Sequence, residues 1–382
     1  MLRNYLQSAI GSVSVSTFSV GRFSIPIVPT VAIVLAGLLL AIFRPRIARR
    51  HLIAAAVAIG MIALAQQITD YYFGHRFFEL QMNWHYFAYG IFALLMYRDL
   101  KPRGLPFARI MLVTFGLALL YSTFDEGFQL MITSRIFDTS DIGKDGWGAL
   151  TGITVLLIAK EQDVLARGKW KTIRRPTLKA YLDHASSVWV LLVSFTLMLL
   201  SYSSLLADAR YAGTVLMLTL GTFAVFLMIL HLSRIRPAGR ALLGLAVIGA
   251  LALAVQMVRH RNDQIVERRY AWTVYKGFPI PFFDVMIFRN GGFRLVDKKH
   301  LFNARDRKFL NGQGADIIII GAGYRGEGGK GFPHQSGTRF IYNPVIERAS
   351  QVIILPTPAA CDRFNLLKGQ GKNVLFVIHA TC

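Results

Sequence analysis

Long apolar stretches alternate with short polar links over roughly the first two thirds of the chain. A bilayer core needs about 20 mostly apolar residues per helix, so this alternation predicts a polytopic α-helical membrane protein. The third and fifth stretches are short, and their polar ends would have to lie against neighbouring helices. About eight transmembrane helices are predicted, near residues 27–43, 51–69, 84–97, 107–125, 146–160, 185–206, 211–232 and 240–258.

The pattern changes from about Tyr270 onward. Short runs rich in β-branched and aromatic residues are separated there by Gly-rich links, which is typical of strands, and Ala360 to Lys368 can form a helix. The strand-like runs are 283–288, 317–320, 351–355 and 374–378. The chain is therefore expected to end in a small α/β domain. The predicted regions are a polar segment 1–26, an extra transmembrane helix 27–49, a four-helix domain 50–163, three further transmembrane helices 185–258 and the α/β domain 270–382.

The composition supports a membrane protein and the charge gives its orientation. The 382 residues are 54% hydrophobic, with 43 Lys and Arg against 21 Asp and Glu, a net charge of +22. In a soluble protein this excess would suggest nucleic acid, but here it lies in short loops and no nucleic-acid motif is present. The positive residues gather in alternate loops, 18 of them in 44–50, 98–109, 160–184 and 233–240 and 4 in the others.

The positive-inside rule places the first set of loops in the cytoplasm. The chain is thus expected to be a multi-pass protein of the inner (plasma) membrane, with its α/β domain on the non-cytoplasmic side. Arg259, Arg261, Arg268 and Arg269 follow the last span and oppose this orientation. The two cysteines, Cys361 and Cys382, exclude a disulfide framework and a four-cysteine zinc site.

An ionisable cluster lies at the end of the fourth span and the start of the fifth. Glu126 and Gln129 are three residues apart and share a helical face, and Gly148 and Gly152 form a small-xxx-small pair that permits close helix packing. Charged groups at a membrane edge are functional candidates, while a solvated loop with helix caps is the alternative. The cluster comprises His85, Tyr89, Glu126, Gln129, Arg135, Asp141, Asp145, Gly148 and Gly152.

This motif resembles the VanZ-like membrane domain over residues 50–163. Three departures stand out: Asp145 replaces the usual Asn, Thr133 and Ser134 stand where a Pro is usual before Arg135, and Gln81-Met82 replaces an acidic–basic pair. The resemblance implies a four-helix membrane unit in a cell-envelope context, associated with glycopeptide resistance. It implies no particular reaction, because no activity is established for that family.

The α/β domain carries a second motif. Gly321-x-Gly323-x-x-Gly326 after an apolar strand is similar to a dinucleotide fingerprint, but no helix-forming segment follows, so dinucleotide binding is rejected. Together with Gly321 and Gly323, the residues Thr357, Cys361 and Asn365 resemble a family of small β/α domains that includes a mitochondrial assembly factor of respiratory complex I. The resemblance implies protein contact and assembly rather than catalysis. Cys361 begins a predicted helix, where a thiolate is stabilised, although a small buried residue is the favoured reading.

These features favour an accessory, structural or assembly subunit of a membrane protein complex, with no cofactor or metal; they weigh against enzymatic activity but leave that question open. Its partners would be the bilayer and another membrane protein. If the chain is such a subunit, we expect Arg135 to form ion pairs with Glu126 and Asp141 and so to fix the link between the fourth and fifth spans. The alternative is an envelope protein that recognises or modifies an anionic lipid or lipid-linked saccharide, with Arg135 as the anion clamp and Glu126, Asp141 and His85 supplying acid–base capacity. Transport is a weaker hypothesis, because no inverted repeat is visible.

Overall fold

A computed structural model describes residues 47–72, 80–131, 137–161, 175–260, 262, 264–332, 339–343 and 345–381, together with parts of 16–42. It divides into two compact units, which are treated separately here. The helical unit consists of Met1–Thr69, His75–Ser203 and Ala212–His231. The C-terminal unit consists of Asp70–Gly74, Ser204–Tyr211 and Leu232–Cys382.

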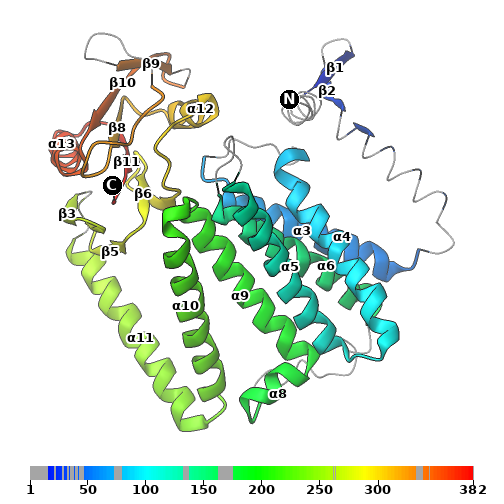
Figure 1. Ribbon diagram of the computed structural model, residues 1–382. Helices are drawn as coiled ribbons and strands as arrows, with labels where there is room; N and C mark the ends of the chain where they lie inside the picture. Colours follow the sequence, from blue (N-terminus) through cyan, green and yellow to red (C-terminus); the bar gives the residue numbers. More distant parts are fainter. Residues whose placement is uncertain are drawn as a thin grey trace. The chain divides into compact units, whose positions relative to one another are not determined.

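Long helices form most of the helical unit, in agreement with the predicted helical region (Figure 1). A short hairpin of β1 (Thr17–Val20) and β2 (Phe23–Pro26) precedes them. The helices are α3 (Arg49–Thr69), α4 (Leu80–Leu100), α5 (Phe107–Gln129), α6 (Thr139–Ala159), α8 (Leu178–Asp183), α9 (Ala185–Leu205) and α10 (Ala212–Leu232). One further long helix, α11 (Arg236–Arg259), belongs to the C-terminal unit.

Five helices in the described part of the chain are long and apolar enough to cross a membrane: α3, α5, α9, Ala209–Leu232 and α11. The total of eight spans remains a prediction. Helices α4 and α6 occupy the third and fifth predicted spans, and each has 21 residues, but neither is among the five that are apolar enough to cross a membrane. Most residues of the predicted span 27–43 lie outside the described residues.

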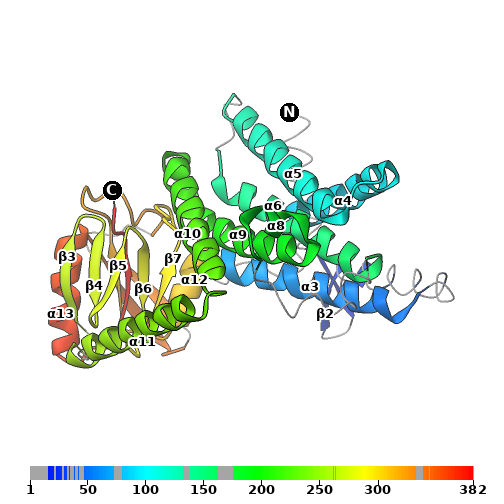
Figure 2. The ribbon, with the colours of Figure 1, turned by 90° about the horizontal axis from the view of Figure 1, so that it is seen from below.

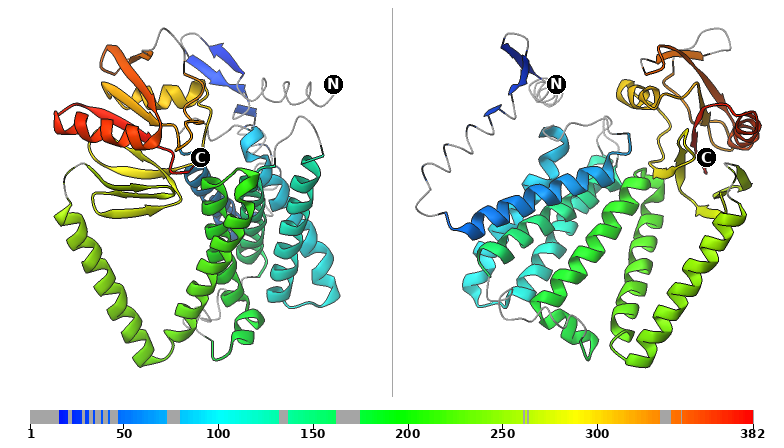
Figure 3. Two further views of the ribbon diagram at one scale, coloured as in Figure 1. Left: turned by 60° about the vertical axis from the view of Figure 1, so that its left-hand side comes forward. Right: turned by 180° about the vertical axis from the view of Figure 1, so that it is seen from behind.

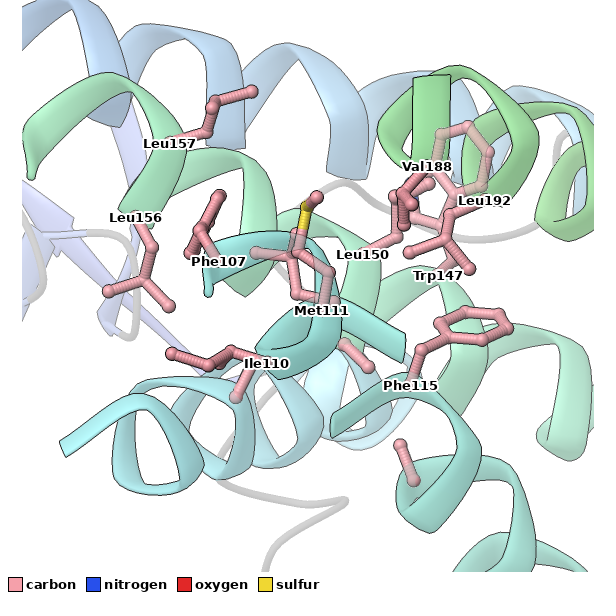
Figure 4. Packing of buried hydrophobic residues seen from close by; sticks show 14 of the residues in the cluster. Phe107, Ile110, Met111, Phe115, Trp147, Leu150, Leu156, Leu157, Val188 and Leu192 are labelled. Atoms are coloured by element: carbon pink, nitrogen blue, oxygen red, sulfur yellow. The ribbon is translucent and has the colours of Figure 1, made fainter. Parts of the chain in front are cut away.

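Helix α6 lies at the centre of the helical unit and is buried along most of its length. It packs against α3, α4 and α5, and the side chains of Trp147 and Leu150 meet Met111 of α5 and Val188 of α9 (Figure 4). The Trp147 indole donates a hydrogen bond of 2.9 Å to the Met61 carbonyl of α3. A helix surrounded by other helices can bury polar side chains only where these side chains have hydrogen-bond or ionic partners. The polar side chains of α6 therefore need partners from this chain.

Glycine allows α6 to approach the α4 backbone. A Cβ added at Gly148 would lie 2.8 Å from the His85 carbonyl oxygen, and one added at Gly152 would lie 2.5 Å from the Gly90 carbonyl oxygen. Both distances are too short for a side chain. The Gly148 and Gly152 pair therefore provides the close helix packing that its spacing indicates.

The C-terminal unit contains a six-stranded mixed sheet, as the predicted α/β domain requires. Its order is β7-β6-β11-β8-β10-β9, and β8 pairs in parallel with both β10 and β11. The strand-like runs predicted from the sequence, 283–288, 317–320, 351–355 and 374–378, correspond to strands β6, β8, β10 and β11. The strands of this sheet are β6 (Asp284–Ile287), β7 (Phe293–Val296), β8 (Ile317–Gly321), β9 (Arg339–Asn343), β10 (Arg348–Leu355) and β11 (Val374–Ile378).

A second, three-stranded antiparallel sheet covers part of the first (Figure 2). It consists of β3 (Ile265–Arg269), β4 (Trp272–Tyr275) and β5 (Phe278–Pro281), and it follows α11 directly (Figure 3). Helix α13 (Thr357–Gly369) completes the core, in which Phe364 packs against Phe376 and Tyr275. Helix α12 (Ala304–Gly312) contacts β9.

Candidate functional site

The polar cluster of the helical unit is organised around Asp145, in the second turn of α6. His85 of α4 places its Nδ1 2.8 Å from Asp145 Oδ1, and Ser122 of α5 donates its hydroxyl to Asp145 Oδ2 at 2.6 Å. Tyr89, one turn after His85, also forms side-chain hydrogen bonds with Ser122 and Asp145. One carboxylate therefore links three helices.

A buried lysine balances the second aspartate. Lys144 Nζ donates to Asp141 Oδ1 at 2.7 Å, and His85 Nε2 lies 3.5 Å from Asp141 Oδ2. His85 thus has a carboxylate beside each ring nitrogen. Since Lys144 is itself 8% exposed, the pair forms a compact ion cluster at the start of α6.

Glu126 forms a separate polar contact at the end of α5. Its side chain is 2% exposed, and its two oxygens accept hydrogen bonds from Gln129 Nε2 at 2.7 Å and from the Asp138 backbone N–H at 2.9 Å. Asp138 caps α6 by accepting from the Ser140 N–H at 2.8 Å. Glu126 therefore joins the last turn of α5 to the cap of α6, as a helix-linking contact.

The structure brings together His85, Tyr89, Asp141 and Asp145, and it places Glu126 with Gln129. Arg135 lies outside the described residues, so its predicted bridge from Glu126 to Asp141 stays a prediction. Ser122, Asp138 and Lys144 also take part in these contacts, although the sequence pattern did not single them out. Lys144 offered a usable signal, because it stands three residues after Asp141 on a helix.

The geometry of this cluster favours holding helices over activating a nucleophile. The Ser122 hydroxyl donates to the aspartate and not to His85, so the histidine is not placed to take its proton. No group of three His, Cys, Asp or Glu side chains that could hold a metal ion occurs among the described residues. The contacts described here pair each carboxylate of the cluster with a donor from this chain.

The motif residues of the α/β domain fasten α13 to the sheet. Thr357 Oγ1 accepts from the Gly323 N–H at 3.0 Å and donates to the His379 carbonyl at 2.7 Å. Asn365 bonds both backbone groups of Ile265, accepting at 2.8 Å and donating at 3.0 Å. A Cβ at Gly321 would lie 3.0 Å from Thr357 Oγ1. These contacts join β3, β8, α13 and the chain after β11.

Cys361 is fully buried between α13 and the sheet. Burial raises the pKa of its thiol to about 12. A thiolate is therefore disfavoured at neutral pH, which agrees with the reading of Cys361 as a small buried residue.

A buried ionic network that the sequence did not reveal lies at the carboxyl end of the parallel strands. Asp284 is 1% exposed and accepts from His379 Nδ1 at 2.6 Å, from Lys298 Nζ at 3.1 Å and from the Ala380 N–H at 2.8 Å. Burial opposes its ionisation, but His379 and Lys298 hold the pKa of Asp284 below its ordinary value. Lys298 also donates to Thr381 Oγ1 at 2.7 Å.

Loops from between the long helices belong to the same unit as this network. The Tyr211 hydroxyl lies 3.0 Å from Thr381 Oγ1, and the Tyr72 ring meets Phe302 edge-on with 5.8 Å between the ring centroids. Three wholly buried polar atoms around these loops have no hydrogen-bond partner among the described residues: Tyr72 OH, Asp297 Oδ1 and His379 Nε2. Burying such atoms costs free energy unless water reaches them.

The chain was compared with known proteins. No family model and no curated protein matches it, and the VanZ-like resemblance rests on the sequence motif. The C-terminal region resembles the solved structure of a protein titled MT938, at 20% identity and a TM-score of 0.24, over 31% of this chain and 98% of that one. It also resembles the conserved hypothetical protein PH1505 from Pyrococcus horikoshii OT3, at 22% identity and a TM-score of 0.25, over 31% of this chain and 99% of that one.

Proposed function

We propose that this chain is an accessory, structural or assembly subunit of a membrane protein complex. The observation that carries the proposal is helix α11. Every one of its 24 residues is described, and none is buried. The helix is long and apolar enough to cross a membrane, and its half-buried residues, Ala238, Gly239, Leu242 and Leu253, lie in its first two and last two turns.

The surface of α11 is suited to another helix. Ala246, Ala250 and Ala254 recur every four residues and are all exposed. Residues at this spacing share one face of a helix, and small side chains let two membrane helices approach closely. No described residue of the C-terminal unit covers that face, and we propose a transmembrane helix of a partner protein as its occupant.

Two further features support a subunit over an enzyme. The ionisable groups between α4, α5 and α6 are paired with one another, which suits a scaffold. The sequence motif of the α/β domain resembles a family that includes an assembly factor of a respiratory complex, and this supports protein contact as the domain's role.

The test is an affinity purification of the tagged full chain in mild detergent, followed by mass spectrometry of co-purifying proteins and lipids. Two variants sharpen it. Ala250→Phe fills the small-residue face, whereas Ala252→Phe makes the same change about 200° away around the helix. Both alanines are exposed, so both variants should insert and fold.

A stoichiometric membrane-protein partner that is lost with Ala250→Phe and kept with Ala252→Phe is the expected result. A chain that purifies without a protein partner, carrying an enriched anionic lipid, would instead support the envelope-lipid function. Equal recovery of the partner with both variants would show that this face of α11 does not bind the partner.

A further inference from the structure

Helix α8 carries an exposed apolar side that the subunit proposal does not use. Leu178 and Leu182 are four residues apart, so they share one side of this six-residue helix. Their side chains are 58% and 48% exposed, so the described residues of the helical unit leave this side largely uncovered. The place of α8 beside the long helices indicates what covers it.

Helix α8 lies at one end of two segments that are long and apolar enough to cross a membrane, α9 and Ala209–Leu232, which contains α10. A single residue, His184, separates α8 from the start of α9 (Figure 1). In the last turn of α10, His231 meets the Tyr181 ring edge-on, with 5.9 Å between the ring centroids. When α9 and α10 cross a bilayer, α8 therefore lies at the surface of that bilayer.

Contacts on either side of α8 fix its orientation. Just before the helix, Arg175 donates to the hydroxyl of Ser187 at 2.8 Å and to that of Ser186 at 3.1 Å, both in the first turn of α9. Within the helix, Tyr181 is 1% exposed, and α5 also packs against α8. Because the chain is held at these points, α8 cannot rotate freely about its axis, and the leucine side keeps one direction.

The other residues of α8 are arranged around it as a membrane surface requires. Successive residues lie about 100° apart around a helix. Tyr181 is therefore on one flank of the leucines, and Lys179 is on the other flank, with Asp183 beyond it. Lys179 and Asp183 are both exposed. Around the helix, a buried side, an apolar side and a charged side follow one another, which is typical of a helix lying in a membrane interface.

The charge around α8 is mainly positive. The loop 160–184, which is predicted to be cytoplasmic and ends in α8, has seven Lys and Arg against three Asp and Glu. Lys179 adjoins the leucine side, so its long side chain can reach groups that lie just above the lipid chains. The cytoplasmic leaflet carries anionic lipids, and their headgroups match this charge.

We propose that α8 lies in the interface of an anionic membrane surface. Leu178 and Leu182 insert among the lipids at the level of the headgroups, Lys179 contacts the headgroup phosphates, and Asp183 faces water. Since α8 is joined to α9 and packs against the end of α10, this contact sets the depth at which those two helices lie in the bilayer.

The test uses the purified full chain, one copy in each lipid nanodisc, so that both faces of the bilayer are open to water. The background carries Cys382→Ser, and the buried Cys361 stays unlabelled. A bimane fluorophore is attached at Leu182→Cys or, as the matched control, at Asp183→Cys. Its emission is quenched either by nitroxide-labelled phosphatidylcholine in the bilayer or by iodide in the water.

The lipid quencher is expected to reduce emission about threefold more at Leu182→Cys than at Asp183→Cys, and iodide is expected to do the reverse. Strong quenching by iodide at Leu182→Cys would place the leucine side in water. Weak quenching by both agents would place it against protein. Either result overturns the proposal.

The contact with anionic headgroups is tested by charge reversal in the Leu182→Cys chain. Adding phosphatidylglycerol to phosphatidylcholine nanodiscs should increase quenching by the lipid. Lys179→Glu should lower the tendency of α8 to insert by about tenfold in the anionic nanodiscs. Lys308→Glu, at an exposed lysine of the C-terminal unit, is the control and should change nothing.

Equal quenching with and without phosphatidylglycerol, or an equal loss in Lys179→Glu and Lys308→Glu, overturns the assignment of an anionic surface. None of these outcomes depends on whether a protein partner is found, because each nanodisc holds this chain alone.

Discussion

Asp145 shows at the residue scale why a carboxylate suits this helical unit. Its two oxygens accept from His85 and Ser122 separately. An asparagine at this position would have one acceptor oxygen, and its amide nitrogen would face one of these two donors. The carboxylate of Asp145 therefore matches two donors, one on α4 and one on α5.

Asp297 gives a pH-dependent prediction. Burial raises the pKa of this carboxyl to about 7, with Lys299 acting in the opposite direction. The folded domain thus keeps a proton between about pH 4 and 7 that the unfolded chain releases, so this group makes stability fall as pH rises through that window. Asp297→Asn should remove the effect and stabilise the domain at pH 8 by a few kcal/mol, on the order expected for a shift of this size.

Hydrogen exchange of peptides covering β6 and β7 in the full chain, corrected for intrinsic rates from pH 5 to 8, measures this stability. Asp362→Asn, at an exposed acid, is the control. An unchanged pH profile in Asp297→Asn would contradict the assignment.

Helical spacing in the sequence was enough to group some residues of the candidate site. His85 with Tyr89 and Glu126 with Gln129 each share a face, and the structure keeps each pair together. Ser122 and His379 could not be selected in this way, because a serine within an apolar helix and a histidine after a strand have many ordinary roles. Their partners, Asp145 and Asp284, are 23 and 95 residues away, so tertiary packing alone brings them together.

At the scale of elements, the α4–α6 contact is the tightest helix approach described here. Gly152→Ala would place a methyl group against the Gly90 backbone and Ala93, neither of which can rotate away. We expect it to destabilise the helical unit by roughly 1–3 kcal/mol, which is typical of overpacking. Thermal unfolding in detergent measures the change.

Gly116→Ala on α5 is the matched control, since a Cβ there meets nothing within 4 Å. It should leave stability unchanged or raise it slightly, because alanine favours a helix more than glycine does. Equal melting temperatures for Gly152→Ala and wild type would show that α4 and α6 separate easily.

The sequence predicted the elements with strong, continuous apolar signals. Strands β6, β8 and β11 are almost wholly buried within the sheet, and residues 352–355 of β10 form an apolar run that is at least half-buried. Strands β3, β4 and β5 were not predicted, because they are short and their turns lack a clear sequence signal. Ala271 and Lys276 adopt positive φ in these turns, but neither residue type is typical of a turn. Helix α12 has nine residues, and its capping box of Asn303 and Asp306 was its main local signal.

For the whole molecule, the side of the membrane occupied by the α/β domain is the central prediction. The distribution of positive charge among the loops predicts that the domain lies outside the cytoplasm. Tyr72 and Tyr211, from two loops assigned to the same side, belong to the domain's compact unit, which supports that assignment. A cysteine introduced at the exposed Lys308 should therefore react with a membrane-impermeant maleimide in intact cells.

The background for this experiment carries Cys382→Ser, and the buried Cys361 remains because its thiol is protected. Arg234→Cys, in a loop predicted to be cytoplasmic, should react only after the membrane is permeabilised. The reverse pattern for the two positions would place the domain in the cytoplasm.

Tyr72 packs against Phe302 and the half-buried Tyr211 contacts Thr381, and these contacts between early and late parts of the chain have a consequence for biosynthesis. The ribosome delivers both loops before any strand of the domain exists, so the domain can complete its core only after earlier spans have delivered those loops to its own side. A chain that skips or adds one span leaves Phe302 and Thr381 without these neighbours. The domain then folds completely only if the chain has inserted with the correct topology. Copies with the wrong topology expose an incompletely packed surface to proteases and chaperones.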